Sequence, residues 1–170
     1  MLKAALDDFG KYVVQQSRSN LSKQDKNVSK KLYNSISYET KVNKNSFELT
    51  INMVDYGKFI DKGVKGVNSS AKAPTSPFKY GSGTGKKGGL TSGINGWVRA
   101  RRFQFKDRKS GKFMSYDSTA FLIRRSIWFT GIKTTNFLTT PFERAFKRLP
   151  EDIVEAYGLE LDSLMETTIL

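Results

Sequence analysis

The segment Asp117–Phe146, DSTAFLIRRSIWFTGIKTTNFLTTPFERAF, decides the fold, because it holds two helix patterns together with the signals that begin and end them. The Ser118 hydroxyl can accept from a free backbone N–H, which predicts a helix N-cap at this residue. Strongly apolar turns follow, and Gly131 supplies the left-handed residue at which helices commonly end. The apolar residues of these turns are Phe121, Leu122, Ile123, Ile127, Trp128 and Phe129.

A second helix is predicted directly after a short connector, in which Phe137 and Leu138 form an apolar anchor. Thr140 is typical of an N-cap, Pro141 suits the first helical position, and Glu143 completes a capping box. The pattern therefore predicts a helix, a glycine stop, an anchored loop and a proline-started helix.

The N-terminal region predicts helices before any strand. Residues 2–18 have apolar side chains at helical spacing, and Ser19-Asn20 is a stop signal. Ser22 with Asp25 three residues later predicts the start of a second helix. Its apolar stripe is Val28, Leu32 and Ile36 or Ser35.

The apolar period then changes from about 3.6 to 2, which predicts a β-hairpin. Residues 36–42 and 47–53 alternate apolar and polar side chains on either side of a turn at 43–46. Only one face of this hairpin is apolar, so only that face must be packed against another element. The flanking helices can pack on it. The predicted class is therefore α+β: an antiparallel β-sheet packed by N-terminal and C-terminal helices, with a long basic Gly-rich loop and a second β-hairpin.

Residues 54–63 predict a short helical turn that ends at Gly63 and tucks Tyr56 and Phe59 under the sheet edge. Residues 64–96 are rich in glycine, serine and lysine, and predict a long flexible loop that becomes ordered on assembly. Within this loop, Gly83–Gly88 matches G-x-G-x-x-G. The residues before it are a poor strand and the nearest acid downstream is Asp107, so a lysine-bearing glycine linker is the preferred interpretation.

Residues 90–101 predict a short helix, and 101–116 predict a second, basic β-hairpin with its turn at 107–111. Phe103, Phe105 and Phe113 would share one face of this hairpin. Basic residues here and in the glycine-rich loop are candidate contacts to DNA backbone or to another subunit. They are Lys86, Lys87, Arg101, Arg102, Lys106, Arg108, Lys109 and Lys112.

Charge is unevenly distributed along the chain, whose formal net charge is +13. Residues 56–133 hold 17 Lys/Arg and 3 Asp/Glu, so they carry essentially all of the excess. Residues 150–170 instead predict an acidic C-terminal helix that begins after Pro150. A basic middle and an acidic end in one chain favour head-to-tail contact between copies.

Composition excludes several kinds of chemistry. The chain has no Cys and no His, which removes the usual zinc sites, Ser-His-Asp and Cys-His catalysis. No cofactor site is predicted, and the expectation is a protein that is not an enzyme. No apolar run approaches the length of about eighteen residues that a membrane span needs. The length of 170 residues suits a single domain, 1–170, and the acids near the N-terminus argue against a secretion signal.

The central unit also resembles a family, the neck and tail-completion proteins of tailed bacteriophages, also called head–tail joining or minor tail components. The residues that carry the resemblance are Ala120–Ile127, Gly131-Ile132-Lys133, Phe137-Leu138 and Pro141-Phe142 with Ala145-Phe146, and before them Leu32, Ser35, Ile36, Tyr56, Phe59-Ile60 and Gly63. The 64–96 insertion and the region past Pro150 extend beyond the family pattern.

The resemblance implies a structural virion protein of the neck or tail, assembled in the host cytoplasm. It would form a homo-oligomeric ring around the DNA channel and contact portal or connector and tail proteins, with no membrane partner. Packaged DNA could touch its basic residues through backbone contacts.

Two other functions are compatible with the residues. A cytosolic nucleic-acid-binding protein would use the basic segment 56–133, with Trp97, Phe103 and Phe105 as stacking groups. A metal-dependent nuclease would use Asp55, Asp61 and Asp107 as carboxylate ligands.

Overall fold

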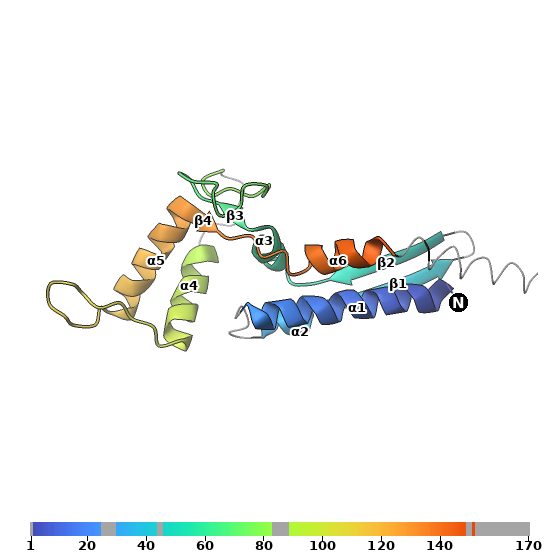
Figure 1. The fold of residues 1–170 in the computed structure, drawn as a ribbon. Helices are drawn as coiled ribbons and strands as arrows, with labels where there is room; N and C mark the ends of the chain where they lie inside the picture. Colours follow the sequence, from blue (N-terminus) through green and yellow to red (C-terminus); the bar gives the residue numbers. More distant parts are fainter. Residues whose placement is uncertain (1, 25–29, 44–45, 83–88, 149–150, 152–170) are drawn as a thin grey trace, which may run out of the picture. The chain divides into compact units, whose positions relative to one another are not determined.

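The computed structural model describes residues 2–24, 30–43, 46–82, 89–148 and 151, which form an α+β fold with two small antiparallel sheets (Figure 1). The predicted α+β class is therefore confirmed. The chain divides into two compact units where a single domain was predicted. Met1–Gly57 and Asn136–Leu170 make up the hairpin unit, and Lys58–Thr135 make up the inserted unit. The division follows from the chain order, because the inserted unit interrupts the hairpin unit between its sheet and its last helix.

The described residues of the hairpin unit form three helices and one β-hairpin. Their bounds are α1 (Leu2–Lys23), α2 (Lys31–Ser35), β1 (Ser37–Asn43), β2 (Ser46–Asn52) and α6 (Thr139–Phe146). β1 and β2 pair antiparallel with Ser37 opposite Asn52 and Asn43 opposite Ser46, which confirms the predicted hairpin. The tip residues 44–45 lie outside the described residues.

The core of the hairpin unit forms along α1, which lies beside the hairpin and α6 (Figure 1). Leu6, Phe9 and Val13 are buried at the helical spacing that the sequence predicts. The Phe9 ring packs edge-on against Phe142 of α6, with 5.5 Å between the ring centroids. The partly buried residues packed on this cluster are Leu49, Ile51, Leu138 and Ala145.

α1 continues past the predicted stop at Ser19-Asn20, so that prediction is wrong. Tertiary contacts outweigh the local signal here: Leu21 is fully buried, and the Asn20 amide donates to the Phe137 carbonyl at 3.2 Å. Ser22 is no N-cap, because it lies inside α1 and its hydroxyl donates to the Arg18 carbonyl.

The second predicted helix is present only as the five-residue α2, and Asp25 and Val28 lie outside the described residues. Arg18 ties α2 to α1: its guanidinium donates to the carbonyls of Tyr33 and Ile36 at 3.1 and 2.9 Å. These bonds occupy carbonyls at the end of α2, which need partners because no further helical turn follows.

In the inserted unit, the residues that the structure describes form three helices and a pair of two-residue strands. Their bounds are α3 (Gly57–Lys62, which begins at the last residue of the hairpin unit), β3 (Val64–Lys65), α4 (Gly89–Ala100), α5 (Tyr116–Thr130) and β4 (Gly131–Ile132). β3 and β4 pair antiparallel, with Val64 opposite Ile132. The turn predicted at 54–63 is thus α3, ended by Gly63 at a φ of 71°. Within the inserted unit Phe59 packs on Phe78, and Tyr56 is exposed.

The long flexible loop predicted over 64–96 is wrong at both of its ends. α4 begins at Gly89, which makes 89–96 helical. At the other end, the Lys65 N–H donates to Phe78 O and the Tyr80 N–H donates to Lys65 O, which forms a parallel bridge. Backbone hydrogen bonds to distant residues therefore order a segment that has no periodic pattern of its own. Residues 83–88, which carry the G-x-G-x-x-G match, lie outside the described residues.

α5 and α6 lie in the predicted regions, but both begin earlier than predicted and have different caps. Ser115, not Ser118, is the N-cap of α5, because its hydroxyl accepts from the Ser118 N–H at 3.1 Å. Thr140 is not the N-cap of α6, since its N–H already donates to Asn136 O and α6 begins at Thr139. The anchor role predicted for Phe137 is confirmed, since this side chain is fully buried.

Gly131 provides a test of this architecture. Its φ of 83° and ψ of −178° lie in a region that only glycine occupies readily, and an added Cβ would collide with the Val64 carbonyl. We expect Gly131→Ala to lower the free energy of unfolding by about 2 to 4 kcal/mol. The measurement is urea denaturation followed by circular dichroism.

The matched control is Gly93→Ala in α4, where no atom lies within 4 Å of an added Cβ. Alanine favours helix there, so stability should rise by about 0.5 to 1 kcal/mol. Equal effects of the two substitutions would contradict the role assigned to Gly131.

Candidate interaction surface

The inserted unit carries the positive charge of the chain. Lys58–Thr135 contain 17 of the 29 Lys/Arg residues and only 3 of the 16 Asp/Glu residues. The charged segment identified in the sequence, 56–133, thus coincides with a structural unit. A compact unit with this excess of basic residues presents a predominantly positive surface to a partner.

The basic segment 101–116 is a loop between α4 and α5 rather than the predicted β-hairpin. It contains a single antiparallel bridge, between Lys106 and Phe113. Arg101 and Arg102 belong to the turn that ends α4, and Arg102 has a left-handed φ of 51°. A longer β-hairpin would need further hydrogen bonds between its two strands. The Phe105 N–H instead donates to the Thr119 hydroxyl at 3.3 Å.

The predicted contact residues of this loop lie at its surface. Among the described residues, Arg101, Arg102, Lys106, Arg108, Lys109 and Lys112 are all exposed, whereas Lys86 and Lys87 lie outside the described residues. The Lys106 ammonium lies 5.1 Å from the centre of the Phe113 ring, a cation–π distance. Four of these cations, Lys106, Arg108, Lys109 and Lys112, surround the tip of the 101–116 loop.

Asp107 shapes the tip. Its carboxylate accepts from the Ser110 N–H, the Lys109 N–H and the Ser110 hydroxyl at 2.8, 2.9 and 3.0 Å. The bonds from Ser110, followed by the bond from Lys109, lower the pKa of this carboxyl. The acid among the cations therefore folds the turn, whereas the sequence suggested it as a candidate metal ligand.

Three aromatic rings form a chain that runs from α4 into the first part of the 101–116 loop. Trp97 and Phe103 have ring centroids 5.9 Å apart, and Phe103 and Phe105 have centroids 5.1 Å apart. All three rings are exposed, as is Phe113. The structure thus brings together the three residues that the sequence suggested as stacking groups.

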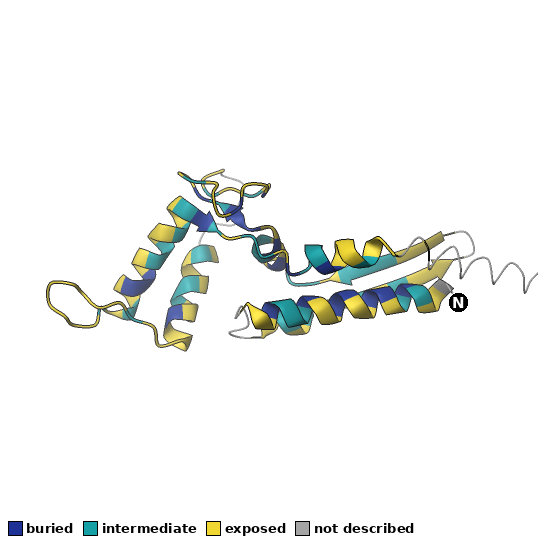
Figure 2. Cartoon of the chain, in the orientation of Figure 1, coloured by how far each residue is buried: buried dark blue, intermediate teal, exposed yellow. Residues whose placement is uncertain are grey.

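Exposed residues recur along α5 (Figure 2). The large apolar ones among them share one face of the helix, and we call this set the α5 outer face. Its members, with their exposed fractions, are Phe121 (54%), Leu122 (40%), Trp128 (42%) and Phe129 (37%). They recur at helical spacing, and the exposed Arg125 lies among them. The sequence identified these residues as parts of strongly apolar helical turns, but an apolar helix pattern does not reveal which apolar face is covered.

An open depression adjoins the α5 outer face. Its volume is about 440 Å³ and its lining is Phe105, Leu122, Ile123, Ser126 and Ile127. The volume falls within the range of small-molecule sites, but only one polar residue lines it. The depression is therefore suited to apolar side chains of a partner rather than to a polar substrate.

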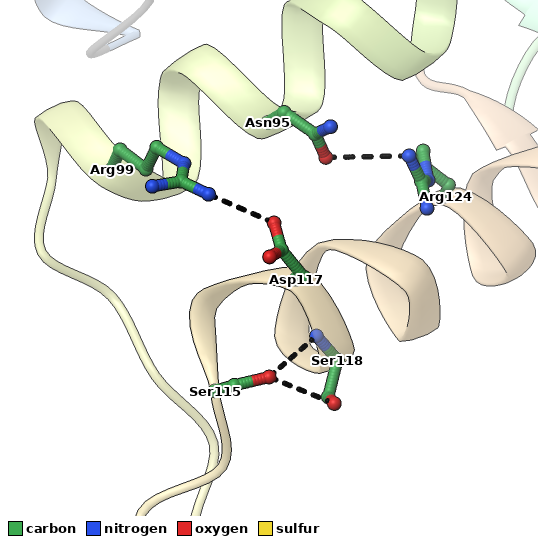
Figure 3. A network of polar contacts seen from close by, with 6 residues as sticks. All are labelled: Asn95, Arg99, Ser115, Asp117, Ser118 and Arg124. Atoms are coloured by element: carbon green, nitrogen blue, oxygen red, sulfur yellow. Dashed lines mark hydrogen bonds and ion pairs between the residues drawn. The ribbon is translucent and has the colours of Figure 1, made fainter.

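Polar contacts hold α4 against α5 (Figure 3). The Arg99 guanidinium donates to the Asp117 carboxylate at 3.0 Å, and the Arg124 guanidinium donates to the Asn95 amide oxygen at 3.3 Å. The first pair is exposed, so it contributes about 1 kcal/mol at most. Together these contacts set the register of the helix pair that carries Trp97 and the α5 outer face.

The other end of α5 is held by the segment 66–82. The Val67 N–H donates to Trp128 O at 2.9 Å. Tyr80 packs on Trp128 with 5.5 Å between ring centroids, and burial raises the pKa of the Tyr80 phenol. The Lys72 ammonium donates to the Thr130 hydroxyl at 2.7 Å. Cations thus lie near both ends of α5, with the exposed apolar residues between them.

The three acids considered for a nuclease do not form a site. Asp61 is buried in the inserted unit, Asp107 folds the loop tip, and Asp55 belongs to the hairpin unit. The described residues contain no group of three or more His, Cys, Asp or Glu side chains placed to hold a metal ion. Within the same part of the chain, no helix is long and apolar enough to cross a membrane.

The chain matches no protein-family model, and no characterised protein or solved structure shows significant similarity to it.

The Asp107 turn gives a pH prediction. The folded pKa is lowered, so the carboxylate form stabilises the turn at neutral pH and this contribution is lost as the pH falls through the folded pKa. We expect the Asp107 carboxyl carbon to titrate below 3.8, the ordinary value for aspartate, and the Ser110 amide proton to shift with the same midpoint. NMR titration measures both. Titration at or above the ordinary value would contradict the turn geometry.

Proposed function

We propose that the chain is a structural subunit of a tailed-bacteriophage virion, without catalytic activity, that forms a ring in the neck or tail around the DNA channel. The observation that carries this proposal is the α5 outer face. A contiguous exposed apolar surface typically marks a site of protein association, because leaving it in water is unfavourable. Four large side chains of one helix are exposed here, on a unit whose charge favours a second, acidic surface.

A ring of identical copies needs two different surfaces on each copy, since its contacts are heterologous. The hairpin unit offers a second apolar surface. Val42 and Phe47 are paired across the hairpin near its tip, and both are exposed. Phe142 and Phe146 of α6 stack with centroids 5.9 Å apart and are also exposed. Each unit therefore contributes apolar area that a neighbouring copy could cover.

Two further observations support the structural role. The chain has neither His nor Cys, which removes the commonest general acid–base and nucleophilic groups. Residues that carry the resemblance to neck and tail-completion proteins occupy architectural positions: Gly131 ends α5, and Phe137 and Pro141 are buried. In this proposal the partners are further copies of the chain and the portal, connector and tail proteins on either side, within the virion. Assembly takes place in the host cytoplasm.

The α5 outer face makes the proposal testable. The unchanged chain should sediment as a species larger than a monomer and give rings by negative-stain electron microscopy. Leu122→Asp combined with Phe129→Asp should shift it to the monomer, because two charges would be buried in the contact without partners. Sedimentation velocity measures the shift.

The matched control for this experiment is Thr91→Asp, which places the same charge at an exposed position of α4 in the same unit. It should leave assembly unchanged. If the unchanged chain stays a monomer at all concentrations and is absent from purified particles, the proposed function is wrong.

A second candidate function, binding of nucleic acid by the free protein, is favoured by one specific observation. The Trp97–Phe103–Phe105 chain runs into a loop whose tip carries four cations. Exposed rings can stack on bases while cations contact phosphates. In a ring, the same cations could contact the phosphate backbone of packaged DNA. The two functions therefore differ in whether the free subunit binds nucleic acid.

Salt dependence separates these functions. Tight binding of single-stranded DNA by the monomer at about 0.15 M salt, with a steep negative slope of log K against log salt, would favour the second function. Replacing Lys106, Arg108, Lys109 and Lys112 by Gln should then flatten the slope by about 3. Replacing Lys3, Lys11, Lys23 and Lys41 of the hairpin unit is the matched control. Absence of binding by the free subunit would reject the second function.

A further inference from the structure

The C-terminal part of the chain is chemically opposite to the inserted unit. Residues 151–170, EDIVEAYGLELDSLMETTIL, contain six Asp/Glu and no Lys/Arg, and 152–170 lie outside the described residues. Apolar residues recur through this sequence at helical spacing. They are Ile153, Ala156, Tyr157, Leu161, Leu164 and Met165.

The α5 outer face has the complementary chemistry. Its four apolar side chains adjoin the exposed Arg125, and the open depression beside them is lined mainly by apolar groups. Cations lie at both ends of the helix: the 101–116 loop is bonded to its first turn, and Lys72 is bonded to its last residue. An acidic segment with an apolar stripe could thus place its apolar side chains on α5 and its carboxylates toward these cations.

We infer that residues 152–170 of one copy dock on the α5 outer face of a second copy. The inference rests on the proposed function, because a ring of identical copies is what brings one copy's segment to the next copy's α5. Recognition follows the general mode in which an amphipathic segment lays its apolar side on an apolar surface. Charge complementarity sets the partner and its orientation.

Electrostatics explains why the occupant is a neighbouring copy. Inserted units with 17 basic and 3 acidic residues each repel one another when they lie side by side in a ring. The six carboxylates of residues 151–170 reduce this repulsion when the segment docks on the basic unit. The acidic segment belongs to the hairpin unit and the α5 outer face to the inserted unit. Each copy can therefore bind one neighbour through its segment and a second neighbour through its α5 outer face. Two different surfaces on each copy are what a heterologous contact requires, and such a contact closes into a ring when the rotation between copies permits.

The absence of cysteine permits a direct test with full-length chains. Leu122→Cys is placed in one chain, and either Leu161→Cys or Leu164→Cys in a second chain with a different affinity tag. The chains are mixed and oxidised, and disulfide-linked heterodimers are counted on a non-reducing gel. A disulfide requires Cα atoms about 4.4 to 6.8 Å apart, so a link reports the contact. Glu39→Cys, an exposed position of the hairpin, replaces Leu122→Cys as the matched control.

We expect the Leu122→Cys chain to form heterodimers with at least one of the two segment variants, and the Glu39→Cys control to form at least tenfold fewer. Charge reversal in the segment, Glu155→Lys with Glu160→Lys and Asp162→Lys, should abolish the link. Thermal unfolding of each variant checks that the fold is kept. The inference is overturned by absence of the link in folded chains, or by a link that forms only within single chains carrying both substitutions.

Removal of residues 151–170 separates the inference from the proposed function. If the unchanged chain forms rings and the shortened chain forms them equally well, the inference is wrong and the proposed function stands. If the shortened chain is a folded monomer while the unchanged chain forms rings, both are supported. If the unchanged chain neither forms rings nor occurs in virions, the proposed function is wrong, and the inference falls with it.

Discussion

The architecture depends on a close backbone approach at the base of the inserted unit. Gly66 and Gly131 lie where an added Cβ would collide with the opposite backbone, at Phe129 and Val64 respectively. Beside this approach, the Thr134 hydroxyl donates to Lys62 O and the Thr135 hydroxyl to Ile60 O. These contacts hold the two ends of the inserted unit together. A unit whose ends are adjacent can interrupt a chain without separating the elements on either side.

The two units of the chain differ in how they use their apolar residues. The hairpin unit buries its apolar residues along α1, and its basic and acidic residues nearly balance. In the inserted unit, close backbone contacts, polar contacts and a few buried side chains hold the helices in place. Large apolar side chains of α5 therefore remain exposed. Exposed apolar side chains among unbalanced positive charge favour a partner that is both apolar and acidic.

The sequence predicted those elements that depend on residues close together in the chain. The alternation in 36–53 predicted the β1–β2 hairpin, and the apolar turns before Gly131 predicted α5. Where two residues offer similar chemistry, sequence could not choose: Ser115 and Ser118 are both suitable caps, and only Ser115 precedes the first turn. The stop predicted at Ser19-Asn20 failed because burial of Leu21 outweighs a weak local preference. In the candidate surface, the exposed loop cations were predicted, but the exposure of the α5 outer face was not.

The amino-acid sequence by itself determined the excess of positive charge in 56–133 and the absence of histidine and cysteine chemistry. It also determined where most of the helices form. These properties follow from residue identity and short-range periodicity. Only the tertiary structure decided that the chain forms two units, that 66–82 is ordered, and that one apolar face of α5 is left uncovered. Each of these depends on which distant segments meet, as Val64 meets Ile132, and no local pattern encodes that pairing.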